Sequence, residues 1–329
     1  MSTTILVTGG AGYIGSHTCK ALARQGFTPV VYDSLARGHD WAVRWGPLET
    51  GDVADQARLA EVFRRHKPAA VLHFAGLISV GESVEQPLLY YRENVGGTLA
   101  LLEAMRAGGV GRLVFSSSAA VYGIPDRVPI PEEAALRPIN PYGAGKLMAE
   151  RLIADAAGAE ALDWVALRYF NATGADPEGE IGEAHEPETH LVPRALMAAA
   201  GKLPRFEIFG DDYKTPDGTC IRDYIHVADL ADAHVAAVRH VLAGRPSQAI
   251  NVGTGTGHSV REIVDAVKRV TGRDFPCPIG QRRDGDPARL VADGRRAVEV
   301  LGFQPRHSTL DQIVTHAWTW LTRAKNPSK

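Results

Sequence analysis

The sequence has little of what marks several large classes of protein. Its 329 residues include only three cysteines, Cys19, Cys220 and Cys277, which lie far apart and form no C-x-x-C pair. This odd, scattered set argues against a disulfide framework or a structural zinc site, and it fits a reducing compartment. No apolar run approaches the ~18–20 residues of a membrane-spanning helix, and the N-terminus shows no signal-peptide pattern. We therefore expect a cytoplasmic protein.

Charge of one sign is not in excess either. Thirty-six Lys and Arg residues face 38 Asp and Glu residues, so the net charge is -2. A chain this close to neutral does not bind nucleic acid or a membrane surface through bulk electrostatics, and we expect neither partner. With 45% hydrophobic and 22% charged residues, the composition is that of a globular protein. The length suits two domains, or one large α/β domain with an appended lobe.

Short apolar runs alternate with longer amphipathic stretches through the first half of the chain. Buried strands are expected at residues 5–7, 29–32, 70–74, 112–115 and 164–167. Helices are expected at residues 16–25, 56–66, 88–107 and 142–157. Continuous apolar runs are typical of parallel strands buried on both faces, and strand–helix alternation predicts helices on both sides of the sheet. The sequence therefore predicts an α/β protein with a Rossmann-type, doubly wound parallel sheet.

The texture of the sequence changes after about residue 170. Residues 171–189 are rich in Gly, Pro, Glu and Asp, which predicts a long loop, and such loops are more often lids than linkers. Helices are then expected near residues 192–201, 227–243 and 260–270. We divide the chain into a first domain over 1–170 and a smaller C-terminal α/β domain over 171–329. Segments such as 220–255 are candidates to return to the first domain.

A glycine-rich loop joins the first predicted strand to the first predicted helix. It contains Gly9, Gly12 and Gly15, and starting at Gly10 it also satisfies G-x-G-x-x-G. Glycines allow a tight turn and a close approach to a pyrophosphate, and the helix that follows presents free N–H groups. Because the strand and the helix are both in place, the loop predicts a dinucleotide site rather than a ligand-free turn.

Asp33 ends the second predicted strand, where an acid can bind the ribose hydroxyls of a dinucleotide. An anion there repels a 2′-phosphate, so the residue favours NAD over NADP, although Arg37 nearby could accept that phosphate. The alternative is that Asp33 caps a turn. Asp52 and Val53 form a weaker candidate contact for the adenine.

Tyr142 and Lys146 place a phenol and an ammonium four residues apart, on one face of a predicted helix. A neighbouring cation favours the phenolate, but this spacing also arises by chance. Lowering a tyrosine pKa from about 10 to about 7 takes roughly 4 kcal/mol. The lysine together with a positively charged nicotinamide could supply it in a partly desolvated site.

The start of this helix and the serines upstream of it support a catalytic role for Tyr142 and Lys146. Asn140 is a predicted N-cap and Pro141 a first helical residue, so Tyr142 falls in the first turn. Residues 116–118 are three serines after a predicted strand, and ligands bind beyond the carboxyl ends of parallel strands. Ser118 is therefore a candidate catalytic group, unless the serines form only a polar loop. Gly143 and Gly145 suggest the close approach of another helix or of the cofactor.

These motifs resemble the extended short-chain dehydrogenase/reductases, and most closely the UDP-glucose 4-epimerases among them. The resemblance covers nearly the whole chain, and its most specific segments are 8–17, 73–77, 80–83, 115–119, 167–171 and 222–226. It implies a homodimer, NAD bound by the first domain and a UDP-sugar bound mainly by the second. It also implies reversible C4 epimerisation of UDP-galactose and UDP-glucose through a 4-keto intermediate, in galactose metabolism.

The resemblance also implies roles for individual residues. The catalytic set is Tyr142, Lys146 and Ser118. Cofactor contacts are expected from Gly9, Gly12, Tyr13, Ile14, Gly15, Asp33, Ser34, Leu35, Arg37, Gly38, Asp52, Val53, Phe74, Ala75, Gly76, Leu77, Asn94, Ser116, Tyr142, Lys146 and Phe170. Substrate contacts are expected from Ser118, Ala119, Ala120, Tyr142, Asn171, His190, Leu191, Glu207, Phe209, Arg222, Arg283, Asp286 and Leu290. Chemically, the arginines suit a diphosphate and Phe209 suits uracil.

Three residues depart from the family pattern. His190 stands where an asparagine commonly contacts the nucleotide sugar, and Ile78 where a lysine can reach the cofactor. Leu290 occupies the position that gates sugar size and is intermediate in size there, which leaves acceptance of UDP-GalNAc open. His185 and His190, with Glu186 and Glu188 between them, are interpreted as a polar lid loop, and no metal is expected.

Other functions stay open beside this one. A nucleotide-sugar dehydratase needs an acid that residues 118–122 do not offer. A 4-epimerase of UDP-pentoses or UDP-N-acetylhexosamines would use the same residues. A non-catalytic NAD-binding regulator would not need the intact set of Ser118, Tyr142 and Lys146.

Overall fold

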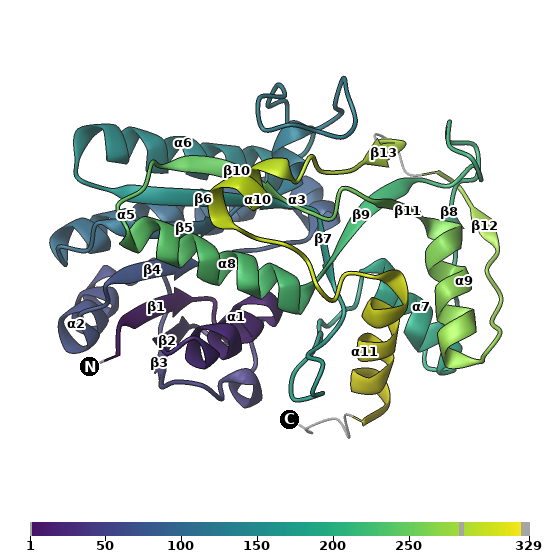
Figure 1. The fold of residues 1–329 in the computed structure, drawn as a ribbon, viewed down its shortest axis with the longest axis horizontal. Coiled ribbons are helices and arrows are strands. Elements are labelled where there is room, and N and C mark those ends of the chain that lie inside the picture. Colours follow the sequence, from purple (N-terminus) through teal and green to yellow (C-terminus); the bar gives the residue numbers. More distant parts are fainter. Residues whose placement is uncertain (1, 283–285, 324–329) are drawn as a thin grey trace.

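A seven-stranded parallel sheet forms the centre of the computed structural model, which describes residues 2–282 and 286–323 (Figure 1). The strand order is β10-β6-β5-β4-β1-β2-β3, the doubly wound arrangement with one further strand at its edge. The bounds are β1 Thr4–Thr8, β2 Thr28–Asp33, β3 Leu48–Thr50, β4 Ala70–His73, β5 Arg112–Ser116, β6 Asp163–Tyr169 and β10 Gln248–Val252. The predicted fold class is confirmed.

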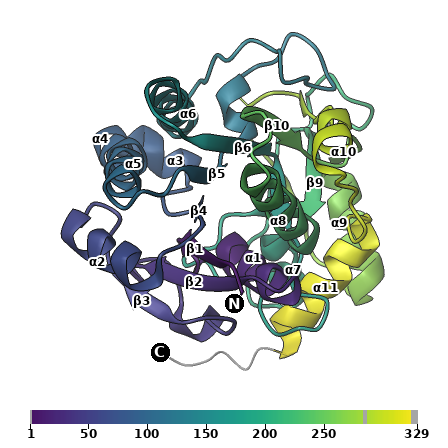
Figure 2. The same cartoon turned by 60° about the vertical axis from the view of Figure 1, so that its left-hand side comes forward.

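Both faces of this sheet are covered by helices, as the continuous apolar runs predicted. In β1, Ile5 and Val7 pack into the core on one face, while Leu6 packs into the core on the other. Figure 2 shows the two helical layers. One contains α1 (Tyr13–Arg24), α8 (Val227–Leu242) and α10 (Arg295–Leu301), and the other contains α2 (Gln56–His66), α5 (Gly97–Ala107) and α6 (Pro141–Ala159).

The segment predicted as one helix over 88–107 is helical throughout, but it contains a π-helical turn. It consists of α4 (Pro87–Tyr90), the π-helical turn η2 (Tyr91–Gly96) and α5, and it is preceded by α3 (Val80–Glu85). Short 3-10 turns also occur as η1 (Asp40–Ala42) and η3 (Ala119–Tyr122). Within the described part of the chain, no helix is long and apolar enough to cross a membrane.

A smaller lobe packs beside the carboxyl edge of the large sheet. Its strands are β7 Asn171–Thr173, β8 Ile208–Phe209, β9 Ile221–His226, β11 Gly257–Ser259, β12 Ile279–Gly280 and β13 Arg289–Leu290. Its helices, α7 (Leu191–Ala199), α9 (Val260–Thr271) and α11 (Leu310–Arg323), share a separate apolar core. The prediction that 171–189 is all loop was wrong at its start, because β7 pairs with β9.

The two halves of the chain are interwoven. Strand β10 lies beside β6 in the large sheet, and α8 packs in the same core as α1. The large sheet therefore takes elements from beyond residue 170, within the segment expected to return. The boundary at residue 170 itself stays a prediction.

Candidate active site

Tyr142, Ser118 and Lys146 lie together at the carboxyl edge of the large sheet. The Asn140 side chain caps α6 by accepting a hydrogen bond of 2.8 Å from the Gly143 amide, which fixes Tyr142 in the first turn. The Ser118 hydroxyl interacts with the Tyr142 phenol and favours its ionised form. The Lys146 Nζ atom lies 6.0 Å from the centre of the Tyr142 ring. All three side chains are buried.

One of the two glycines after Tyr142 has a clear steric reason. A Cβ atom at Gly143 would lie 2.5 Å from the Ala120 carbonyl oxygen, so only glycine lets η3 approach the start of α6. A Cβ atom at Gly145 would meet nothing closer than 3.8 Å, and close packing does not require glycine there. The suggestion of close approach is therefore confirmed for Gly143 alone.

In the protein by itself, Lys146 does not make Tyr142 acidic. Burial raises the pKa of Tyr142 above its usual value, against the opposing hydrogen bond from Ser118. Burial also lowers the pKa of Lys146 to about 8, although the charge of Glu150 opposes this. Desolvation therefore dominates in the protein alone, and the lowered pKa expected from the lysine and the nicotinamide together stays a prediction for the NAD-bound protein. A further positive charge is needed, as the bound nicotinamide would provide.

The glycine-rich loop has the shape that a pyrophosphate requires. Gly9 has a φ of +72°, and a Cβ atom there would lie 2.5 Å from the Ala75 amide nitrogen. A Cβ atom at Gly15 would lie 2.2 Å from the Gly9 carbonyl oxygen. Helix α1 begins at Tyr13 directly after this turn, and its N-cap residue Gly12 offers no side-chain cap. The first amides of α1 therefore remain available to an anion, and the loop fits NAD.

Asp33 caps the loops on either side of it. Its carboxylate accepts hydrogen bonds from the amides of Ala11 at 3.0 Å and Leu35 at 2.8 Å. Both interpretations of Asp33 are compatible, because a carboxylate has further acceptor sites for ribose hydroxyls. Arg37 instead donates to Glu82 at 3.0 Å, and this ion pair competes with any 2′-phosphate.

The other predicted cofactor residues follow the carboxyl ends of neighbouring strands. Residues 34–38 come after β2, 52–53 after β3, 74–77 after β4 and 170 after β6, while Ser116 ends β5. Asn94 lies in the π-helical turn, and its side chain forms two hydrogen bonds with the Leu77 backbone, at 2.7 and 2.9 Å. Asn94 thus holds the loop after β4. Ile78, the departure from the family pattern, is 47% exposed.

Ala119 and Ala120 lie in η3 beside Ser118 and Tyr142, and the other predicted substrate residues come from the smaller lobe. Arg222 on β9 lies opposite Leu290 on β13, and Leu290 packs against the apolar cluster of Ala119 and Tyr122. Arg222 forms an ion pair with Asp286 through its Nη2 atom. This pair engages part of the guanidinium group that was expected to bind a diphosphate. Asn171 donates to the Asp223 carbonyl oxygen at 2.9 Å. Arg283 lies outside the described residues.

Two other predicted substrate residues, on or beside β8, keep their roles as predictions. Phe209 is 37% exposed. Glu207 precedes β8 and accepts a hydrogen bond of 3.3 Å from Arg205. His190 and Leu191 stand at the start of α7.

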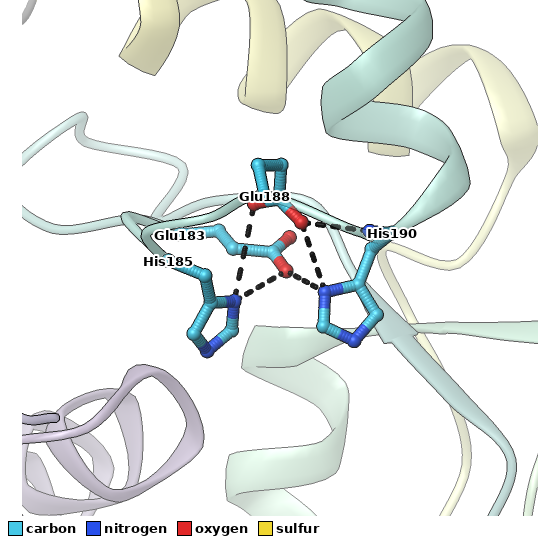
Figure 3. A group of neighbouring side chains, drawn as sticks. All are labelled: Glu183, His185, Glu188 and His190. Carbon is cyan, nitrogen blue, oxygen red and sulfur yellow. Dashed lines mark hydrogen bonds and ion pairs between the residues drawn. The ribbon is translucent and has the colours of Figure 1, made fainter. Parts of the chain in front are cut away.

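Four side chains before α7 form a compact cluster, Glu183, His185, Glu188 and His190 (Figure 3). Nδ1 of His190 lies 2.8 Å, and Nδ1 of His185 3.0 Å, from the same Glu183 oxygen. Burial disfavours the His190 imidazolium, but Glu183 and Glu188 raise its pKa to about 10. The imidazole nitrogens and carboxylate oxygens of the cluster are atoms that could bind a divalent cation. Their distances are, however, those of hydrogen bonds between imidazole and carboxylate groups. The sequence had suggested Glu186 for this cluster, but Glu183 takes that place.

Comparison with known proteins agrees with this arrangement. Residues 5–253 match the model of the NAD dependent epimerase/dehydratase family. A UDP-glucose 4-epimerase of Rhizobium leguminosarum bv. trifolii is 54% identical over 317 residues, which are 96% of this chain and 97% of that protein.

Solved structures with the same fold include two that hold NAD. One is UDP-glucose 4-epimerase from Brucella ovis in complex with NAD, 57% identical with a TM-score of 0.95 over 96% of this chain and 98% of that one. The other, from Stenotrophomonas maltophila, contains NAD and formylated UDP-arabinopyranose, and is 44% identical with a TM-score of 0.94 over 97% and 98% of the chains. The chain belongs to the NAD-dependent epimerase/dehydratase family.

Proposed function

We propose that this chain catalyses the reversible, NAD-dependent interconversion of UDP-galactose and UDP-glucose through a 4-keto intermediate. The observation that carries the proposal is the buried group of Tyr142, Ser118 and Lys146, at the sheet edge where the glycine-rich loop lies. The named relatives support the same reaction. NAD, when bound, supplies the hydride acceptor for the sugar C4 atom and later returns the hydride.

The residues of the chain then have separate tasks. Tyr142 accepts the proton of the sugar 4-hydroxyl and returns it after the ketone has turned, and Ser118 hydrogen-bonds the same oxygen. Lys146 donates to the Ser116 carbonyl oxygen at 2.8 Å, which holds its ammonium near the phenol. Arg222 is proposed to bind the diphosphate, so that the sugar can turn about a fixed anchor.

Product identification tests the proposal. The purified protein is incubated with UDP-galactose, UDP-GalNAc and UDP-arabinose, the products are identified, and the nucleotide released on denaturation is analysed. We expect UDP-glucose from UDP-galactose, and released NAD. No turnover of any of these sugars, with NAD still bound, would instead support a non-catalytic NAD-binding protein. Products from the other two sugars would define the gate at Leu290.

Replacing Asp33 with alanine should weaken NAD binding. Loss of charge-assisted hydrogen bonds to the ribose and to the Ala11 and Leu35 amides should raise the dissociation constant roughly 10- to 100-fold. The measurement is NAD content per chain after gel filtration. Asp55→Ala is the matched control, because Asp55 also caps a backbone amide, that of Arg58 at 3.0 Å, but at the start of α2. Equal NAD contents in the two variants would contradict the role of Asp33.

We also propose that the chain forms a homodimer through α3 to α6. Five apolar side chains on these helices are strongly exposed: Val80 at 45%, Val84 at 63%, Leu88 at 76%, Leu99 at 46% and Met148 at 47%. Such apolar exposure across adjacent helices is typical of an interface, and Figure 2 shows these helices on one side of the molecule. A cytoplasmic location is proposed as well, since all three cysteines are free thiols.

Leu88→Glu should convert the proposed dimer to a monomer, because it places a charge in a desolvated interface. Light scattering after size-exclusion chromatography measures the mass. Val298→Glu is the control, since Val298 is 43% exposed on α10, in the other helical layer. A mass that is the same for wild type and Leu88→Glu would refute an interface at this face.

A further inference from the structure

The three serines at the end of β5, residues 116–118, contact α6 at three successive turns. Lys146 donates to the Ser116 carbonyl oxygen at 2.8 Å, and the Ser118 hydroxyl interacts with the Tyr142 phenol. Between them, the Ser117 hydroxyl donates to Glu150 at 2.5 Å. Tyr142, Lys146 and Glu150 are spaced four residues apart, so they share one helix face. The serine contacts thus include a third helix residue, Glu150, which the proposed reaction does not use.

Glu150 is half of a buried ion pair with Arg168 on β6. The side chains are 7% and 6% exposed. Arg168 Nε donates to one Glu150 oxygen at 2.9 Å and Nη2 to the other at 2.6 Å. This bidentate geometry fixes the two side chains relative to each other. A buried pair of this kind seldom adds net stability over an apolar pair, so stability alone gives no reason for it.

The ion pair holds the chain on both sides of Ser118. On one side Ser117 is bound to Glu150, as described. On the other, Arg168 Nη1 donates to the Tyr122 hydroxyl at 3.1 Å, and that hydroxyl donates to Asn251 at 2.7 Å. Ser118 therefore lies in a six-residue segment, 117–122, that is tied at each end to the same buried pair.

We propose that Glu150 and Arg168 are positioning residues, which hold segment 117–122 against α6 so that the Ser118 hydroxyl stays at the Tyr142 phenol. The inference rests on the proposed function only in making Ser118 and Tyr142 the catalytic groups. The serine hydroxyl must meet both the phenol and the substrate oxygen, and small displacements of reacting groups are costly to the rate. The proposed diphosphate contact of Arg222, on β9 of the smaller lobe, does not depend on the ion pair.

Ser117→Ala is the sharpest test, because it removes one anchor and leaves the ion pair intact. We expect kcat for UDP-galactose to fall roughly 10- to 100-fold, with KM within about twofold of the wild-type value. Ser117→Thr, which restores a hydroxyl donor, should recover most of the rate. Tyr122→Phe removes the anchor on the other side and should also lower kcat rather than raise KM.

Ser259→Ala is the matched control, since Ser259 is a buried serine whose hydroxyl also donates to a carboxylate, that of Asp217, in the smaller lobe. Ser259→Ala should lower the free energy of unfolding about as much as Ser117→Ala does, but it should leave kcat unchanged. If kcat of Ser117→Ala matches that of the control, or if KM alone changes, the positioning role is overturned.

A crystal structure of Ser117→Ala provides a readout that does not depend on turnover. We expect the Ser118 hydroxyl to move away from the Tyr142 phenol, and an unmoved Ser118 would overturn the inference. If the wild type converts none of the UDP-sugars, the proposed function fails, while this structural comparison still decides whether the pair positions Ser118.

Discussion

Replacing Tyr142 with phenylalanine is expected to lower kcat for UDP-galactose by roughly 10²- to 10⁴-fold, the usual contribution of a general acid–base group. The change removes one hydroxyl from a side chain that is 8% exposed, and it leaves the ring packing intact. Ser118 cannot replace the phenol, because a serine hydroxyl does not ionise near neutral pH. Steady-state rates with UDP-galactose and the yield of UDP-glucose measure the effect.

NAD content separates a chemical loss from a structural one. Tyr142→Phe should retain as much NAD as the wild type, since the glycine-rich loop and Asp33 are untouched. Tyr90→Phe is a suitable control, because Tyr90 is also buried and its hydroxyl donates to Glu82 at 2.8 Å, but it lies on α4. Near-normal turnover by Tyr142→Phe would sink the assignment of Tyr142 as the base.

Features that depend on local sequence could be predicted well. The predicted helix 56–66 coincides with α2, and its signals are local: an aspartate that caps the first turn and an apolar stripe. The start of α6 follows from Asn140 and Pro141 in the same way. Because parallel strands end at a common edge, the residues after β1, β2, β4 and β5 could also be placed near one another from sequence.

Features that depend on distant contacts could not be predicted. Strand β7 exists because β9, some 50 residues later, offers it hydrogen-bonding partners. The ion pair between Arg222 and Asp286 joins residues 64 apart, and no local sequence pattern predicts it. The raised pKa of Tyr142 in the protein alone could not be predicted for a related reason, since burial depends on the whole fold. Glu183 was missed because only the path of the loop before α7 brings it to His185 and His190.

Lys20→Met should destabilise the protein by about 3–5 kcal/mol, the usual cost of breaking a buried ion pair on one side. Lys20 lies on α1, the helix that directly follows the glycine-rich loop. Its side chain is only 5% exposed. Its Nζ atom lies 2.7 Å from Asp176, 2.9 Å from Glu178 and 2.6 Å from Glu180. Asp176 is itself 3% exposed, so the variant leaves a carboxylate buried without its cation.

Urea unfolding of matched variants can identify the source of this loss. Arg24→Met removes a cation whose side chain is 53% exposed and which pairs with the exposed Glu178, and it should cost less than about 1 kcal/mol. In the Lys20→Met background, Asp176→Asn should restore part of the lost free energy, because it removes the unpaired charge. A loss no greater than that of Arg24→Met would show that α1 does not depend on Lys20 to anchor the loop that leads to α7. A large loss that Asp176→Asn relieves would instead show that Lys20 holds this loop against α1, the helix that follows the glycine-rich loop.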